Sequence, residues 1–507
     1  PDSWESTEEL ILNFTGRMTE HDVTAFAADN GLRVVIKSSF INSYKFAIDR
    51  TKNPLLSAAA MARRLRETFP SIITLAEAEA FCVASGSPSD PEYVSGSQYW
   101  VNRVLLPAAW DMNTGSADVI IGVLDSGVDR NHGDLQSAMW HNTADPFDGV
   151  DNDGNGFVDD YNGWNFVSMP RPPVAADDDP GPPDYNPMDV QGHGTAVAGV
   201  AAALTNNAVG IAGTAGGWGS SGGAKIMAVR CGYKSTPSGR EEFNTMDTRD
   251  AFFYAARNGA RIINFSGGWS GFSAVVKEGV DTAIVRGAIV VCAVQNDENA
   301  TYLGYPAAHD SVIAVGATSI NNAIYSAHGQ GLHVVAPGEN VRTTGVGNTY
   351  GYQSGASFAA PQVSGIAALL LAINPNLTRW EVRRIICENS SKLGTYNYSQ
   401  NKQYGTWSNE LGYGVANAYG AAFAVDSQST VTMSSSSRWV GDLVVPSGKT
   451  MTVADGVTIT LDSTANIRVI GTLILDGDVS IVRNDGYSDV IVDGALSVLS
   501  GSTVVVG

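Results

Sequence analysis

Four short segments constrain the fold most strongly, because each places one polar residue among small residues beside an apolar run. In chain order these polar residues are Asp125, His193, Asn296 and Ser357. Asp125 ends the run Val-Ile-Ile-Gly-Val-Leu-Asp, which is typical of a buried parallel strand, whereas His193 and Ser357 open small, apolar runs that predict helices. An acid at a strand end, with a histidine and a serine at two helix N-termini, is one way for an α/β sheet to hold a Ser/His/Asp constellation.

The pattern of the chain around these segments predicts a central domain over residues 86–426. Apolar strands alternate there with helical stretches, so we expect an α/β fold with a mostly parallel sheet flanked by helices. The predicted strands are 119–124, 225–229, 262–265, 289–294 and 312–315. Residues 145–189, which are acidic and rich in proline and glycine, are typical of an inserted loop.

The two ends of the chain follow patterns of their own. Residues 1–85 predict a ferredoxin-like α+β domain, with strands at 9–14, 32–37, 44–49 and 72–75 and helices at 20–29 and 58–69. Residues 427–507 are rich in Val, Ile, Thr and Gly and predict short strands without helices. This all-β module is either a β-solenoid, which buries a core by stacking turns, or a small β-sandwich.

Composition excludes several classes of partner. The 507 residues carry 31 basic and 51 acidic side chains, and the net charge of −20 argues against nucleic acids and anionic membrane surfaces. No uninterrupted apolar run of about 18 residues predicts a transmembrane segment. The four cysteines, Cys82, Cys231, Cys292 and Cys387, match no metal-binding spacing and are predicted to be buried free thiols, with one disulfide as the alternative.

The motifs and their order resemble the subtilisin-like serine proteases. The segments are Val-Leu-Asp125-Ser-Gly, Gly-His193-Gly-Thr and Gly-Ala-Ser357-Phe-Ala-Ala-Pro, and the order Asp, His, Ser is that of subtilisin. The resemblance implies that Ser357 is the nucleophile, His193 the general base and then acid, and Asp125 the carboxylate that orients the imidazole. Asn296 falls where the family places its side-chain oxyanion donor. The residue before it departs from the family pattern, since Gln295 replaces a glycine.

The same resemblance implies how a peptide substrate binds. Ser266, Gly267 and Gly268 match an exposed strand edge against which an extended peptide adds its backbone hydrogen bonds. Gly304 matches the floor of the first specificity pocket, where the absence of a side chain leaves room. We therefore expect a broad specificity with a preference for large apolar residues before the cleaved bond.

Calcium is the predicted cofactor, at two places. The first follows from the resemblance, with the side chains of Asp134 and Asn207 and the carbonyls of Thr205, Val209 and Ile211 as ligands; a plain Asn-rich turn is the alternative. The second follows from the residues themselves, because oxygen-bearing side chains alternate with glycine as at the start of an EF-hand loop. Its candidate ligands are Asp148, Asp151, Asp153, Asn155, the carbonyl of Phe157, Asp159 and Asp160, and a solvated acidic loop is the alternative.

These observations together predict a secreted or cell-surface, calcium-stabilised serine endopeptidase that acts on proteins or peptides through an acyl-enzyme. The N-terminal domain is expected to be a propeptide that inhibits the enzyme within the same chain, with its tail at 76–85 and self-cleavage near Ser85. An independent binding domain is the alternative for this part. For the whole chain, the alternatives are a cell-surface binding or adhesive protein with an idle protease fold and a processing protease of narrow specificity.

Overall fold

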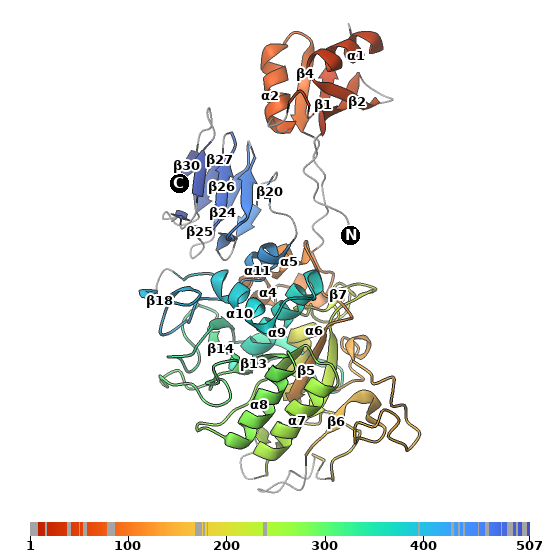
Figure 1. Cartoon of the computed structure of the whole chain (residues 1–507), viewed down its shortest axis with the longest axis vertical. Coiled ribbons are helices and arrows are strands. Elements are labelled where there is room, and N and C mark those ends of the chain that lie inside the picture. Colours follow the sequence, from red (N-terminus) through yellow and green to blue (C-terminus); the bar gives the residue numbers. More distant parts are fainter. Residues whose placement is uncertain are drawn as a thin grey trace.

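The computed structural model describes most of the chain. The described residues are 9–15, 18–37, 42–49, 51–53, 58–78, 87–167, 175, 178–179, 181–236, 241–393, 396–426, 430–433, 437–439, 442–454, 456–461, 466–477, 479–483, 490–492, 495–498 and 504–506. They form three hydrophobic clusters, one in the central part of the chain and one toward each end. Figure 1 shows the ribbon of these three parts.

A seven-stranded parallel sheet lies at the centre, in the order β15-β14-β13-β12-β5-β9-β6. The strands are β5 (Ile120–Asp125), β6 (Trp164–Asn165), β9 (Lys225–Arg230), β12 (Ile262–Phe265), β13 (Ile289–Ala293), β14 (Ile313–Thr318) and β15 (Val334–Pro337). All the predicted central strands are present, close to the expected bounds. The sequence did not predict β15, nor β6, which lies inside the segment expected to be a loop.

Two helix pairs cover this sheet, α6 (His193–Ala202) with α9 (Ala356–Ile373) and α7 (Thr245–Arg257) with α8 (Ala274–Val285). Gly122 of β5 faces α7, because a Cβ built on it would lie 3.1 Å from Cβ of Ala255. Asp125, an odd number of positions further along the strand, faces Gly194 of α6. Since side chains alternate along a strand, the two pairs lie on opposite faces, which confirms the predicted α/β layering.

Shorter elements surround the sheet as connections and hairpins. β7 pairs with β8, β10 with β11, β16 with β17 and β18 with β19, each time antiparallel. The bounds are α3 (Pro91–Val94), α4 (Tyr99–Arg103), α5 (Leu106–Trp110), η1 (Gln136–Ala138), η2 (Asp160–Asn162), β7 (Gly217–Trp218), β8 (Ser221–Gly222), β10 (Gly232–Lys234), β11 (Glu241–Phe243), β16 (Val341–Gly345), β17 (Thr349–Gln353), α10 (Arg379–Glu388), β18 (Gln400–Lys402), β19 (Gly405–Trp407) and α11 (Ala418–Val425).

The N-terminal unit has the predicted order of strands and helices. Its elements are β1 (Glu9–Phe14), α1 (Glu20–Asp29), β2 (Leu32–Lys37), β3 (Ser43–Ile48), α2 (Ala58–Thr68) and β4 (Ile73–Ala78). The antiparallel sheet order β2-β3-β1-β4 is the ferredoxin-like arrangement. Thr19 begins α1 with a capping box to Asp22. Figure 1 draws this unit apart from the central sheet, and the predicted tail beyond residue 78 lies outside the described residues.

The C-terminal strands form a parallel β-solenoid rather than a sandwich. They stack in three parallel columns, β20-β23-β26-β29, β21-β24-β27-β30 and β22-β25-β28, so that each strand pairs with the third strand after it. The strands are β20 (Thr430–Met433), β21 (Ser437–Trp439), β22 (Leu443–Val445), β23 (Thr450–Val453), β24 (Thr458–Leu461), β25 (Ile467–Val469), β26 (Thr472–Leu475), β27 (Val479–Arg483), β28 (Val490–Val492), β29 (Ala495–Val498) and β30 (Val504–Val506). Tyr419 and Phe423 of α11 belong to the same core, so the hydrophobic packing crosses the predicted boundary at 426.

Among the described residues, one helix, α9, is long and apolar enough to cross a membrane by length and composition, with a mean hydropathy of 1.7 over Ala356–Ile373. It is the central helix of the fold, and 89% of that window is buried inside the protein. Cys231, Cys292 and Cys387 are buried free thiols, as predicted. Cys82 lies outside the described residues.

Candidate active site

Asp125 and His193 meet at the carboxyl edge of the central sheet. Asp125 is the last residue of β5 and His193 the first of α6, and Nδ1 of the imidazole lies 2.7 Å from Oδ1 of the carboxylate. The approach requires glycine at position 194, because a Cβ there would lie 2.1 Å from the carbonyl oxygen of Gly127. Two of the four predicted site residues are therefore in direct contact.

A second acid, Asp189, holds the start of α6 in place. Its carboxylate accepts hydrogen bonds from the backbone N–H groups of Gln191, Gly192 and Thr195, and from the hydroxyls of Thr195 and Ser126, at 2.6–3.0 Å. Asp189 thus satisfies N–H groups at a helix N-terminus and ties them to the residue after Asp125. The sequence analysis missed this role, although an acid just ahead of a predicted helix was a usable signal.

Ser357 is the second residue of α9 and is buried beside the end of β12. Its Oγ donates to the carbonyl oxygen of Ser266 over 3.1 Å, and Oγ of Ser266 donates back to the carbonyl oxygen of Ser357 over 2.9 Å. The imidazole of His193 lies beside the same helix start, with 5.3 Å between its ring centre and that of Phe358. The described hydrogen bond of the Ser357 hydroxyl thus goes to Ser266 rather than to His193.

Asn296 lies against the same helix start. Its Oδ1 accepts the backbone N–H of Ala356 over 2.8 Å, so its NH₂ group remains as the donor. The N–H groups of the first helical turn have no intrahelical acceptor, which leaves the N–H of Ser357 available as a second donor. Both donors lie at the positive end of the helix dipole, where negative charge is stabilised.

The predicted substrate edge directly continues β12 beyond Phe265. Ser266 is buried, and Gly267 and Gly268 are closely packed, since a Cβ on Gly267 would lie 2.7 Å from the ring of Phe243. A Cβ on Gly268 would lie 3.0 Å from the carbonyl oxygen of Tyr305. The neighbouring Phe243 and Tyr305 thus leave little room for side chains at Gly267 and Gly268, and the role of the segment as a substrate edge stays a prediction.

The space expected in front of Gly304 is filled. Oε1 of Gln295 accepts the backbone N–H of Gly304 over 2.6 Å, and a Cβ built on Gly304 would lie 2.5 Å from Nε2 of Gln295. The carbonyl oxygen of Trp269 lies 2.6 Å from the same point. The prediction of a roomy pocket floor is therefore wrong in this structure, because the Gln295 side chain takes the volume that the absent Gly304 side chain leaves.

Glu241 is a further acid at the site, and the sequence analysis did not identify it. It begins β11, and its Oε2 lies 3.0 Å from Nδ1 of His193, the nitrogen that also contacts Asp125. Its side chain is 9% exposed, and burial, followed by repulsion from Asp125, raises its pKa to about 8. Burial alone disfavours the charged imidazolium, but the charges of Asp125 and Glu241 outweigh it and raise the pKa of His193 well above its ordinary value.

The first predicted calcium site has the expected side chains in contact. Nδ2 of Asn207 donates to Oδ1 of Asp134 over 2.9 Å. Asp90, which the sequence analysis did not single out, accepts the N–H groups of Asn206 and Asn207 at 2.7 and 3.3 Å. Both carboxylates are fully buried, and burial raises the pKa of Asp90 to about 6 and that of Asp134 in the same direction.

This donor set fits a hard cation. Two buried carboxylates share one loop, and no lysine or arginine contacts them among the described residues. Oδ2 of Asp134 accepts hydrogen bonds from the N–H of Ile211 and the hydroxyl of Tyr350. The carbonyls of Thr205, Val209 and Ile211 remain predicted ligands, and that of Thr205 accepts the N–H of Gly219 over 2.8 Å.

The second predicted loop folds on its own acids. Asp151 accepts the N–H groups that follow it at positions 154–156, and Asn155 accepts the N–H of Phe157. Asp159 accepts the N–H groups of residues 148 and 149 at 2.8 Å, which joins the two ends of the loop. These turns bend the chain so that its side chains converge.

Three acids meet on the inner side of this loop. Asn142 donates to both Asp153 and Asp160, and the hydroxyl of Tyr254 donates to Asp160 over 2.7 Å. Burial, followed by the charges of these acids and of Asp145, raises the pKa of Tyr254 well above its ordinary value. The oxygen donors fit calcium, with Asp145 added to the predicted set.

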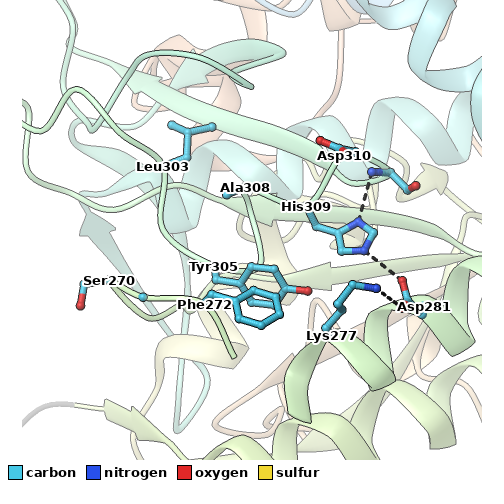
Figure 2. Close-up of a pocket in the computed structure, with 11 residues that line it drawn as sticks. Ser270, Phe272, Lys277, Asp281, Leu303, Tyr305, Ala308, His309 and Asp310 are labelled. Carbon is cyan, nitrogen blue, oxygen red and sulfur yellow. Dashed lines mark hydrogen bonds and ion pairs between the residues drawn. The ribbon is translucent and has the colours of Figure 1, made fainter. Parts of the chain in front are cut away.

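A separate pocket of about 540 Å³ is lined by both neighbours of Gly304 in the chain and contains none of Asp125, His193 or Ser357. Figure 2 shows His309 in its wall, where Nε2 lies 3.0 Å from Oδ1 of Asp281, and Lys277 pairs with the same carboxylate. The rings of Phe272 and Tyr305 meet edge to face at 5.2 Å. This pocket adjoins the predicted substrate edge, because Tyr305 lines it and the Tyr305 carbonyl oxygen lies near Gly268.

Comparisons with known proteins agree with the fold and with the family resemblance. The model of the subtilase family matches residues 116–414. The thermophilic serine proteinase of Bacillus sp. (strain AK1) is 35% identical over 393 residues, 76% of this chain and 84% of that protein. Thermitase of Thermoactinomyces vulgaris is 33% identical over 315 residues, 61% of this chain and 95% of that protein. The solved structure of a protease from Pseudoalteromonas arctica PAMC 21717 has a TM-score of 0.52 and 26% identity, covering 67% of this chain and 100% of its own.

Proposed function

Because this chain is a serine endopeptidase of the subtilase family, we propose that it hydrolyses peptide bonds with Ser357, His193 and Asp125 in the roles of nucleophile, general base and orienting carboxylate. The observation that carries this proposal is the 2.7 Å contact between Asp125 and Nδ1 of His193, with Ser357 at the start of the neighbouring helix. A carboxylate on Nδ1 fixes the imidazole tautomer in which Nε2 accepts a proton.

The reaction begins when the Ser357 hydroxyl turns from the Ser266 carbonyl toward Nε2 of His193. The imidazole takes the hydroxyl proton while Oγ bonds to the carbonyl carbon of the substrate, and the carbonyl oxygen becomes an oxyanion. The NH₂ of Asn296 and the N–H of Ser357 donate to that oxyanion. The imidazolium then protonates the leaving amine, the C–N bond breaks, and water repeats the sequence to release the acyl group from Ser357.

Calcium is proposed to hold the two predicted calcium loops rather than to take part in the reaction. Asp90, Asp134 and Asn207 would bind one ion, and Asp145, Asp153, Asn155 and Asp160 the other. When bound, the ion supplies positive charge between carboxylates that otherwise repel one another.

The N-terminal unit is proposed to be a propeptide, and the mature enzyme to act outside the cell. Its core, from Leu10 to Ile73, is built from residues of this unit alone, which supports a unit that folds separately. Cleavage near Ser85 would free it. The proposed extracellular location of the mature enzyme is supported by its family membership alone.

One experiment tests the activity and the processing together. The purified full chain, Ser357→Ala and the control Ser354→Ala are incubated with casein, and their masses are followed by mass spectrometry. Ser354 is exposed on the strand side of the same turn. We expect casein cleavage and loss of the segment that ends near Ser85 from the wild type and from Ser354→Ala, whereas Ser357→Ala stays intact and inert. Casein cleavage by folded Ser357→Ala would contradict the assigned nucleophile.

A further inference from the structure

We propose that Glu241 is a positioning residue that, as a second carboxylate on Nδ1 of His193, delays loss of the imidazole proton and shifts the activity of the site toward alkaline pH. The inference rests on the proposed function, since it concerns the histidine that acts as the base. It goes beyond the triad, which assigns one carboxylate to that nitrogen.

The geometry gives Glu241 direct access to the imidazole. Its Oε2 lies 3.0 Å from Nδ1, only slightly further than the 2.7 Å of Asp125 Oδ1. One ring nitrogen of His193 and one carboxylate oxygen from each of Asp125 and Glu241 lie within 4.8 Å of one another. β11 is held by antiparallel pairing of residues 241–243 with residues 234–232 of β10, so the carboxylate is mounted on a hairpin that leaves β9 beside the site. A charged side chain on a paired strand has less freedom to move away than one on a loop.

Because both carboxylates are buried, the second one has a strong effect on the protonation of the imidazole. The Asp125 and Glu241 side chains are 0% and 9% exposed, and Asp125 Oδ2 and Glu241 Oε1 accept no hydrogen bond within the described structure. Two adjacent buried carboxylates with free oxygens repel each other unless a positive charge or a proton lies between them. The imidazolium of His193 supplies that charge, so both acids favour its protonated form.

The other titratable groups around the pair do not cancel this effect. Cys231 follows β9, Asp189 precedes α6 and Asp247 lies on α7. Burial raises the pKa of the Cys231 thiol well above its ordinary value, so the thiol is neutral, and burial also raises the pKa of Asp189. No lysine or arginine forms an ion pair with Asp125 or Glu241 among the described residues. The charges that face His193 are therefore negative.

The consequence for activity has a definite sign. A general base must be unprotonated, and the acidic limb of kcat/KM against pH reports the pKa at which the free enzyme loses that proton. Since Glu241 and His193 are coupled, the limb belongs to the pair rather than to either group alone. Replacing Glu241 by an uncharged side chain of the same shape removes one stabiliser of the imidazolium, so the limb moves to lower pH.

The test compares wild type, Glu241→Gln and the control Glu242→Gln. Glu242 is the next residue of β11, and side chains of successive strand residues point to opposite faces. The rate of inactivation by a fluorophosphonate and kcat/KM on a peptide substrate are measured across the acidic, neutral and alkaline range. We expect the midpoint of the acidic limb of Glu241→Gln to move to lower pH by about one unit, so that at a pH below the wild-type midpoint the variant reacts about tenfold faster than the wild type. The pH profile of Glu242→Gln should match that of the wild type.

A second measurement does not depend on activity. In the Ser357→Ala background with ¹³C-labelled histidine, the His193 resonance is titrated with and without Glu241→Gln, and we expect the same downward shift of its pKa. If the acidic limb of kcat/KM and the His193 titration of Glu241→Gln coincide with those of the Glu242→Gln control, the proposed role of Glu241 is wrong. A folded wild type that reacts with neither probe nor peptide at any pH would instead overturn the proposed function, and with it this inference.

Discussion

Replacing Asp189 by alanine tests how the start of α6, and with it His193, is held. The substitution removes the acceptor of five hydrogen bonds, three from backbone N–H groups and two from hydroxyls. Hydrogen bonds to a charged group contribute about 1.5–3 kcal/mol each, but contributions within one network do not add. Removal of the buried carboxylate also relieves its desolvation, which is the largest cause of its raised pKa. A net loss of about 3–5 kcal/mol in unfolding free energy follows, because each buried donor left without an acceptor costs about 1–3 kcal/mol.

The same substitution affects catalysis, because Gly192, which donates to Asp189, precedes the catalytic histidine. A displacement of about 1 Å in a catalytic group costs about a hundredfold in rate. Urea unfolding and kcat are measured for Asp189→Ala and for the control Val190→Ala, whose side chain is exposed. We expect the control to match the wild type. An Asp189→Ala protein as stable and as active as this control would refute the reasoning, because the hydrogen bonds of Asp189 would then not position the start of α6.

Two further predictions concern the specificity pocket and the acidic loops. Gln295→Gly removes the side chain in front of Gly304. We compare kcat/KM for a peptide with phenylalanine before the cleaved bond with that for a peptide with alanine there, and expect this ratio to rise about tenfold or more. An unchanged ratio would place the specificity pocket elsewhere. Removing calcium with a chelator should lower the unfolding free energy by about 2.7 kcal/mol relative to protein at a calcium concentration about 100 times the Kd. Asp134→Asn should reduce this difference. A melting temperature that neither treatment changes would contradict calcium binding at these loops.

The sequence predicted those parts of the molecule in which a local pattern determines the structure. The run ending at Asp125 and the small residues around His193 and Ser357 carry their own strand and helix signals, so these elements were predictable. The solenoid was predictable as one of two alternatives, because its short strands recur between turns. The choice between solenoid and sandwich needed the parallel pairing of each strand with the third strand after it, which composition does not encode.

What the sequence could not predict depends on contacts between distant segments. Gln295 was visible as a departure from a glycine, but only the structure shows its amide bound to the Gly304 N–H and lying in the expected pocket. Asp90 contacts the turn at Asn206 and Asn207, and Asn206 is 116 residues further along the chain.

Glu241 shows the limit most clearly. It comes well after His193 in the chain, in a segment with no motif, and its approach depends on how β10 and β11 pair beside the site. A family motif identifies the residues that perform a reaction, because their spacing relative to strands and helices is fixed. The charges that set the pH at which the reaction runs come from whichever segment folds over those residues, so they have to be read from the structure of each chain.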